Sequence, residues 1–405
     1  MPTPPTGLRA LHLENIHPDG AQALAAAGFE VESRAGALGE DQLIEALKGV
    51  QVLGIRSNTA VSERVLDASP DLLAIGAYCI GTNQIDVAGA ARRGIAVFNA
   101  PFSNTRSVVE LALAEIIALT RRLTERDRAM HAGIWHKSAS GAHEVRSRRL
   151  GIVGYGNIGT QLSVLAENLG MQVSFFDTAD KLALGNARRC ESLEELLTTV
   201  DVVTLHVDGR HGNSGLFGEA EFALMRERSI FLNLSRGFVV DYDALRRHLS
   251  SGHLAGAAVD VFPAEPKTTG EEFRSPLRGM ANVILTPHIG GSTEEAQRDI
   301  GAFVGGKLAD YARSGATALS VNLPSLILPE VAGEHRLVHI HRNTPGVLAS
   351  INSVLAGDGV NIDAQFLATR GDIGYVITDV GAALETSTLD LLEKLAETIR
   401  LRVLS

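Results

Sequence analysis

Short apolar runs alternate with amphipathic stretches along the first hundred residues. The apolar runs predict strands at residues 10–13, 52–55, 73–75 and 97–98, and the amphipathic stretches predict helices at residues 20–27 and 41–47. Strands that alternate with helices are typical of a parallel sheet covered by helices on both faces. The pattern therefore predicts an α/β lobe at the start of the chain.

The same alternation resumes after a long predicted helix at residues 105–122 and a basic, polar stretch that ends at Arg149. Strands are predicted at residues 150–153, 173–176, 202–205, 230–234, 257–259 and 283–285. This order predicts a second doubly wound parallel sheet, followed by a helix at residues 294–311.

A different pattern follows Pro324, Pro329 and Gly333, which mark a linker. Strands are predicted at residues 336–341, 361–368 and 375–380, helices at 345–356 and 389–399, and a short strand at the end. This βαββαβ order predicts a small ferredoxin-like domain. The overall class is α/β, with two Rossmann-like lobes and this terminal domain.

Composition limits the classes of function. The 405 residues, 45% hydrophobic and 21% charged, predict a globular protein of two or three domains. A net charge of -10 argues against nucleic acid or an anionic membrane as a partner. Residues 1–7 read as a loose tail rather than a signal peptide, and Glu115 interrupts the longest apolar stretch. Cys79 and Cys190 lack metal-ligand spacing, so we expect no metal and a reducing cytoplasm.

The segment VGYGNIG at residues 153–159 is the clearest chemical motif. Its glycines, Gly154, Gly156 and Gly159, follow a predicted strand and precede a predicted helix at residues 161–169. Asp177 ends the next predicted strand, eighteen positions after Gly159, where a carboxylate would bind the adenosine ribose. The arrangement predicts a dinucleotide site, and Asp177 favours NAD over NADP because it would repel a 2′-phosphate. The alternative is a glycine-rich turn without a ligand.

Five further segments carry a family resemblance, and they occur in the family's order. They are CIGTNQID (79–86), NAPFSNTRSVVE (99–110), NLSRGFVVD (233–241), GAAVDVFPAEP (256–266) and LTPHIGGST (285–293). With the glycine run, they resemble the D-2-hydroxyacid dehydrogenase family, and within it the short bacterial branch that acts on D-3-phosphoglycerate and carries a C-terminal ACT domain. The resemblance implies a discontinuous substrate domain (1–104 and 292–326), an inserted NAD domain (105–291) and an ACT domain (333–405).

The resemblance implies three catalytic residues, Arg236, Glu265 and His288. Alcohol oxidation needs a base, and the imidazole of His288 titrates near neutral pH. Glu265 would hydrogen-bond that ring and raise its pKa, while the guanidinium of Arg236 would hold the substrate carboxylate. The alternatives are a packed turn histidine, a solvated loop acid and a surface arginine.

The remaining site residues also come from the resemblance. For NAD they are Gly154, Gly156, Asn157, Ile158, Gly159, Asp177, Leu234, Ser235, Arg236, Asp260, His288, Gly290 and Gly291; for the substrate they are Arg56, Ser57, Ile80, Gly81 and Asn104. The family often has a second arginine two positions after Arg56, where this chain has Asn58. Arg56 could equally be an ordinary surface residue. The segment at residues 206–218 also departs from the family pattern beside the expected adenosine site.

The terminal domain implies regulation. HIHRNTPGVL (339–348) and DGVNIDAQ (358–365) resemble an ACT domain in which His341, Asn343 and Asn361 bind L-serine between two paired domains. The expected function is NAD-dependent oxidation of D-3-phosphoglycerate to 3-phosphohydroxypyruvate, the first step of L-serine biosynthesis, in a serine-inhibited homotetramer. A dimerisation domain without effector is the alternative for the terminus. Another 2-hydroxy acid, such as 2-hydroxyglutarate, or an NAD(H)-sensing corepressor-like protein is the alternative for the whole chain.

Overall fold

The computed structural model describes residues 7–266, 270–328, 335–381 and 383–404. The chain forms two compact units, one of residues 104–296 and one of residues 1–103 together with 297–405. Each is described by itself. Part of the expected N-terminal tail, and Pro329 and Gly333 of the expected linker, lie outside the described residues.

The first sheet of the discontinuous unit is parallel, with the strand order β2-β1-β3-β4-β5. Its strands are β1 (Leu8–His12), β2 (Phe29–Ser33), β3 (Val52–Ile55), β4 (Ala74–Ala77) and β5 (Ala96–Asn99). Its helices are α1 (Pro18–Ala26), α2 (Glu40–Ala46), α3 (Glu63–Asp67) and α4 (Val87–Arg92). Every residue of β3 and β4 is buried, as expected for central strands covered on both faces.

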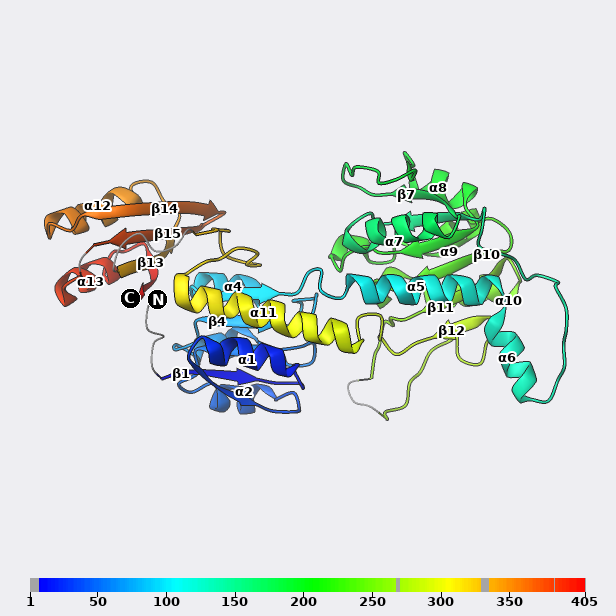
Figure 1. Ribbon diagram of the computed structural model, residues 1–405, viewed down its shortest axis with the longest axis horizontal. Helices are drawn as coiled ribbons and strands as arrows, with labels where there is room; N and C mark the ends of the chain where they lie inside the picture. Colours follow the sequence, from blue (N-terminus) through cyan, green and yellow to red (C-terminus); the bar gives the residue numbers. More distant parts are fainter. Residues whose placement is uncertain (1–6, 267–269, 329–334, 382, 405) are drawn as a thin grey trace. The chain divides into compact units, whose positions relative to one another are not determined.

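Helix α11 (Glu294–Ser314) returns the chain to this sheet (Figure 1). Val304 and Leu308 lie against Gly76 of β4, where a Cβ atom would meet both side chains within 2.8 Å. Gly305 similarly allows α11 to approach the backbone of Gly20 in α1. Small residues at these two crossings let α11 close the apolar core of the sheet.

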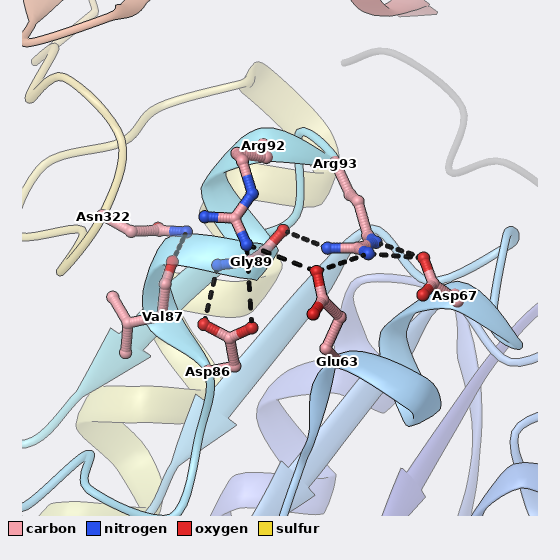
Figure 2. Close-up of polar contacts among 8 residues, drawn as sticks. All are labelled: Glu63, Asp67, Asp86, Val87, Gly89, Arg92, Arg93 and Asn322. Carbon is pink, nitrogen blue, oxygen red and sulfur yellow. Dashed lines mark hydrogen bonds and ion pairs between the residues drawn. The ribbon is translucent and has the colours of Figure 1, made fainter.

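Polar contacts join α3 and α4 on the same sheet (Figure 2). Arg93 forms ion pairs with Glu63 and Asp67. On the other side of α4, Asn322 donates to the carbonyl of Val87 at 3.5 Å. Asn322 also accepts from the Val97 N–H at 2.9 Å, so this buried amide ties the segment after α11 to β5.

The last part of the discontinuous unit is an antiparallel sheet with the order β14-β15-β13-β16. Its elements are β13 (His335–Arg342), α12 (Val347–Gly357), β14 (Ile362–Arg370), β15 (Ile373–Val380), α13 (Thr386–Glu393) and β16 (Thr398–Leu404). The predicted βαββαβ order is confirmed. The helix predicted at residues 389–399 is wrong in extent, because α13 ends at Glu393 and the alternating segment TIRLRVL continues as β16.

A buried ion pair lies inside this antiparallel sheet. Arg336 donates two hydrogen bonds to Asp379, at 2.6 and 2.8 Å, and both side chains are at most 1% exposed. Arg336 also donates to the carbonyl of Ser314 at the end of α11, at 3.1 Å. Nearby, the Tyr375 hydroxyl donates to the carbonyl of Gly315 at 2.6 Å. These bonds attach the antiparallel sheet to the end of α11.

The continuous unit has a seven-stranded parallel sheet with the order β12-β11-β10-β9-β6-β7-β8. Its strands are β6 (Arg149–Val153), β7 (Gln172–Phe176), β8 (Arg188–Arg189), β9 (Val202–Leu205), β10 (Ser229–Asn233), β11 (Leu254–Val259) and β12 (Val283–Leu285). Its helices are α5 (Thr105–Thr120), α6 (Leu123–His131), α7 (Asn157–Asn168), α8 (Leu193–Thr199), α9 (Glu219–Leu224) and α10 (Tyr242–Ser250), with 3₁₀ turns η1 (His211–Asn213) and η2 (Gly237–Val239).

The predicted α/β class, with two parallel sheets and a terminal ferredoxin-like sheet, is confirmed. The polar stretch before Arg149 contains helix α6, which the sequence pattern did not predict because none of its residues is buried. In the described part of the chain, no helix is both long and apolar enough to cross a bilayer.

We predict that Asp379→Ala lowers the free energy of unfolding by about 3–5 kcal/mol, because it leaves the buried Arg336 charge without its carboxylate partner. Urea unfolding followed by circular dichroism measures the change. The control is Asp310→Ala, which removes a pair with Arg313 whose side chains are 50% and 53% exposed, and which should cost at most about 1 kcal/mol. Equal losses in the two variants would contradict the prediction.

Candidate active site

The glycine run forms the turn between β6 and α7. Gly154 has a φ of +94°, and a Cβ atom there would lie 2.6 Å from the carbonyl oxygen of His206. A Cβ atom on Gly159 would lie 2.3 Å from the carbonyl oxygen of Gly154. The fold itself therefore requires glycine at both positions, for the left-handed turn and for close packing of helix against strand.

Gly156 is different, because a Cβ atom there would meet nothing within 4 Å. It precedes α7, and no side chain caps that helix end. Exposed N–H groups at a helix N-terminus attract an anion, and the absence of a Cβ atom lets a phosphate approach the backbone. Asn157 and Ile158 form the first turn of this helix. These features fit the pyrophosphate of a dinucleotide.

Asp177 lies at the end of β7, as predicted. Its carboxylate accepts the backbone N–H of Tyr155 and of Ala179, each at 2.8 Å. These bonds fix the carboxylate beside the glycine turn. Strand β6 lies between β7 and β9, where the winding of the sheet reverses, and ligands bind outside the carboxyl ends of the strands at such a point.

Arg236 follows β10 in a loop held by the buried side chain of Asn233. The Asn233 amide donates to the carbonyl of Arg236 at 3.0 Å, and its oxygen accepts from both the N–H and the hydroxyl of Ser235. The Arg236 guanidinium donates to the carbonyl of Ser235 at 2.7 Å. The loop geometry is thus set by Asn233, while Leu234 and Ser235 are themselves buried.

The loop of Arg236 lies directly against the loop that follows β11. A Cβ atom on Gly237 would lie 2.0 Å from the carbonyl carbon of Phe262, so only glycine allows this approach. The Tyr242 hydroxyl donates to the carbonyl of Val261 at 2.6 Å and strengthens the same contact. The second loop carries Glu265, which accepts the N–H of Phe262 at 2.9 Å.

Asp260, at the end of β11, organises the loop of His288. Its carboxylate accepts the Thr286 hydroxyl at 2.7 Å and the N–H groups of Ile289 and Gly290, each at 2.8 Å. The carbonyl of Asp260 accepts the N–H of His288 at 2.8 Å. These bonds support the backbone of His288, whose φ is +54°. This value lies in the left-handed region, which residues with a side chain adopt rarely.

His288 and Glu265 form the central pair. The Nδ1 atom of His288 lies 2.8 Å from a carboxylate oxygen of Glu265, and about half of the imidazole side chain is exposed. The hydrogen bond with Glu265 raises the pKa of His288, although burial and the charge of Arg236 oppose it. Burial alone would raise the pKa of Glu265, but the bonds from His288 and Phe262 outweigh it and the net pKa is lowered. Nε2 of His288 has no partner in the described part of the chain.

Two ionisable groups of this unit, the buried Glu115 and the half-buried His206, were not identified as site residues from the sequence. Burial, and then the charge of Asp260, raise the pKa of Glu115 on α5 to about 8, and neither of its carboxylate oxygens has a partner among the described residues. Burial lowers the pKa of His206, beside the glycine turn, to about 3. Glu115 is thus mostly protonated and His206 neutral at pH 7. The only sequence signal for Glu115 was its position inside an apolar helix.

The expected substrate residues fall into both units. In the discontinuous unit, Arg56 and Ser57 follow β3, and Ile80 and Gly81 follow the neighbouring strand β4. The carboxyl ends of adjacent parallel strands meet at one edge, so these two loops are neighbours. Asn104 belongs to the continuous unit, where its side chain lies close to Gly291.

The expected effector residues do not converge within one copy of the chain. His341, near the end of β13, is opposite Gly374, and Asn343 donates to the carbonyl of Gly371 at the same end of the sheet. Asn361 precedes Ile362, which pairs with Val380 at the other end. Gly374 and Val380 are six residue steps apart along β15, so about 20 Å of extended strand separates the two ends. Among the described residues no group of side chains has the composition of a metal site.

Comparisons with known proteins agree with this geometry. Residues 113–290 match the model of the D-isomer specific 2-hydroxyacid dehydrogenase NAD-binding domain, and residues 337–400 match the AHAS small subunit-like ACT domain. The chain is 50% identical to the D-3-phosphoglycerate dehydrogenase of Haemophilus influenzae, over 96% of each chain. It is 48% identical to that of Escherichia coli K12, over 98% of this chain and 97% of the relative.

Solved structures show the same architecture. The structure of a D-2-hydroxyisocaproate dehydrogenase is 26% identical, with a TM-score of 0.71 over 78% of this chain and 100% of that chain. A D-lactate dehydrogenase of Treponema pallidum is 26% identical, with a TM-score of 0.69 over 78% of this chain and 100% of that chain.

We predict that Glu265→Gln moves the acid limb of the pH profile for alcohol oxidation to lower pH. As the predicted base, His288 would act in its neutral form in this direction. The Glu265 carboxylate raises the pKa of His288, so its loss should lower that pKa and let the neutral imidazole persist in more acidic solution. The limb is measured as kcat/KM for NADH formation against pH.

A second histidine–glutamate pair in the same unit supplies the control. His248 lies 2.8 Å from Glu219, well away from the three loops of the site in sequence. Glu219→Gln should leave the acid limb in place. A limb that stays at the same pH in Glu265→Gln would contradict the role of Glu265.

Proposed function

The chain belongs to the D-3-phosphoglycerate dehydrogenase family, and on this basis we propose that it oxidises D-3-phosphoglycerate to 3-phosphohydroxypyruvate with NAD, the first step of L-serine biosynthesis. The observation that carries the proposal is the pair of His288 and Glu265 at 2.8 Å. It lies in the unit that matches the family's NAD-binding domain. Alcohol oxidation requires a base with an available ring nitrogen in the unit that also carries a dinucleotide turn.

The residues divide the work as follows. Nε2 of His288 takes the hydroxyl proton, and Glu265 holds Nδ1–H and stabilises the resulting imidazolium. Arg236 binds the substrate carboxylate through its planar guanidinium. The glycine turn at residues 154–159 would hold NAD, which would supply the hydride acceptor. Asp260 keeps the His288 loop in place, and its contact with the cofactor remains a prediction.

We assign the phosphate end of the substrate to Arg56 and Ser57, and its carboxylate end to the loop of Ile80 and Gly81. The support is that the two loops lie at one sheet edge and that the Arg56 side chain has no partner in the described ranges of the chain. Asn58, in place of a second arginine, leaves Arg56 as the main positive charge of this loop. Asn104 of the continuous unit remains a predicted substrate residue.

We further propose that L-serine binds between two copies of the ACT domain. Strand β14 is an edge strand, so a second copy can pair with it. In a two-fold pairing the two β14 strands run antiparallel. Asn361 of the second copy would then approach the end that carries His341 and Asn343. The separation of these residues within one copy is thereby explained, and His341 has a buried Nε2 without a partner among the described residues.

A closed homo-oligomer follows from such sharing, and by likeness to the family we propose a tetramer. The low cysteine content, two residues in 405, is in keeping with the reducing cytoplasm that we propose as its location.

We predict that 3-phosphohydroxypyruvate oxidises NADH with a kcat/KM roughly tenfold or more above that of hydroxypyruvate, because charge-assisted bonds to the phosphate favour it. Pyruvate and 2-oxoglutarate complete the panel, which is measured by the loss of NADH absorbance. His288→Asn should lower kcat about 100-fold or more and leave NADH affinity unchanged. A preference for 2-oxoglutarate would instead favour a 2-hydroxyglutarate dehydrogenase, and no turnover with any oxo acid would favour an NAD(H)-sensing protein.

We also predict complementation between two effector variants. His341→Ala and Asn361→Ala, each alone, should lose serine inhibition, because every shared site lacks one ligand. Co-expressed with different tags, they form mixed pairs in which one site carries both substitutions and the other carries neither. Calorimetry on the mixed species should recover about one serine site per pair. No recovery in mixed pairs would exclude sharing, and serine binding by both single variants would favour a dimerisation domain without effector.

A further inference from the structure

Glu14 is a buried carboxylate outside the three loops that carry Arg236, Glu265 and His288. It follows β1 and is 7% exposed. Its backbone φ of +65° lies in the left-handed region, which residues with side chains adopt rarely. A buried charge in an unfavourable backbone conformation persists only where other interactions stabilise it.

Those interactions are backbone N–H groups of the loop that follows β3. One oxygen of Glu14 accepts the N–H of Thr59 at 2.8 Å and of Arg56 at 3.3 Å, and the other accepts the N–H of Asn58 at 2.9 Å. Glu14 forms no ion pair within the described part of the chain. The loop at residues 56–59 therefore curls around the carboxylate, which satisfies three donors at once.

The opposite side of the loop is held by Gln84. Its amide donates to the carbonyl of Arg56 at 2.5 Å and to that of Gly81 at 3.4 Å. Asn99 donates to the carbonyl of Ile80 at 2.6 Å. Side chains from three other segments thus fix the backbones of both loops, while the side chains of Arg56 and Ser57 are left unbonded by the described residues.

We propose that Glu14 is a positioning residue for phosphate recognition: it holds the loop at residues 56–59 in the shape that presents Arg56 and Ser57 to the substrate phosphate. The inference rests on the proposed function. Glu14 touches no substrate itself, because both of its oxygens face the loop backbone. A preformed loop binds without the cost of ordering itself, so the loss of Glu14 falls on the affinity for the phosphate group.

The test is Glu14→Gln, which keeps the shape of the side chain. Glutamine has one acceptor oxygen, and its amide N–H₂ opposes the N–H donors of the loop. We expect the KM for 3-phosphohydroxypyruvate to rise roughly tenfold. The KM for hydroxypyruvate, which lacks the phosphate, should change less than about twofold, and kcat and the NADH affinity measured by fluorescence should stay within about twofold.

Asn322→Ala is the matched control. Asn322 is also a buried polar residue of the same unit with three backbone partners, Val97, Ile95 and Val87. Figure 2 shows the contact with Val87. Its removal should lower thermal stability and leave the ratio of the two KM values unchanged. If Glu14→Gln does not fold, Gln84→Met serves as the second variant, and it should raise the same ratio by releasing the Arg56 carbonyl.

The outcomes separate this inference from the proposed function. A wild-type enzyme that does not prefer 3-phosphohydroxypyruvate over hydroxypyruvate would contradict the proposed function. A wild-type preference that is unchanged in Glu14→Gln and Gln84→Met, or that falls equally in Asn322→Ala, would overturn the role of Glu14 alone.

Discussion

The hydrogen bonds of the Asp260 carboxylate are the constraint on which the geometry of the candidate site depends. Three donors from the segment of residues 286–290 end on this one buried side chain. They hold His288 in a left-handed conformation that a free loop would leave. Because the main-chain N–H of Asp260 also bonds to the carbonyl of Asn233, the loops of Arg236 and His288 share one anchor. The pair of His288 and Glu265 is a consequence of this anchor.

A buried carboxylate that binds several hydrogen-bond donors also occurs in the discontinuous unit, at Glu14. Glu14 gathers three backbone N–H groups after β3, as Asp260 gathers its donors after β12. In both places a buried carboxylate has no cationic partner among the described residues, and peptide N–H groups stabilise its charge instead. Such bonding leaves the nearby Arg56 and Arg236 available, because neither guanidinium is consumed in neutralising the anchor. A positively charged side chain can then be directed at an anionic substrate.

The local pattern of apolar and polar residues was sufficient to predict several strands. The strands Val52–Ile55 and Val202–Leu205 have the predicted bounds, because short apolar runs are what central parallel strands require. The edge strand Val283–Leu285 also has its predicted bounds. The family resemblance, now confirmed by relatives at 48–50% identity, supplied the three positions that we predict to be catalytic. Neither the local pattern nor the family resemblance identified Glu14 or Glu115 as a site residue. The role of Glu14 depends on residues 42 to 45 positions away, and a single acid between an apolar strand and a helix looks like any loop residue.

The two buried carboxyl groups of the candidate site, Asp260 and Glu115, differ in the hydrogen bonds that they accept. Asp260 accepts three hydrogen bonds, whereas Glu115 has none from the described residues, so the pKa of Glu115 rises to about 8 through burial first and the charge of Asp260 second. Glu115 is therefore mostly protonated at pH 7, while Asp260 contacts the His288 loop. The charge of Asp260 helps raise the pKa of His288, and the charge of Arg236 opposes it. The basicity of the imidazole is thus set by a balance in which the hydrogen bond to Glu265 is the largest contribution, and burial of Glu115 in its neutral form keeps a third negative charge out of that balance.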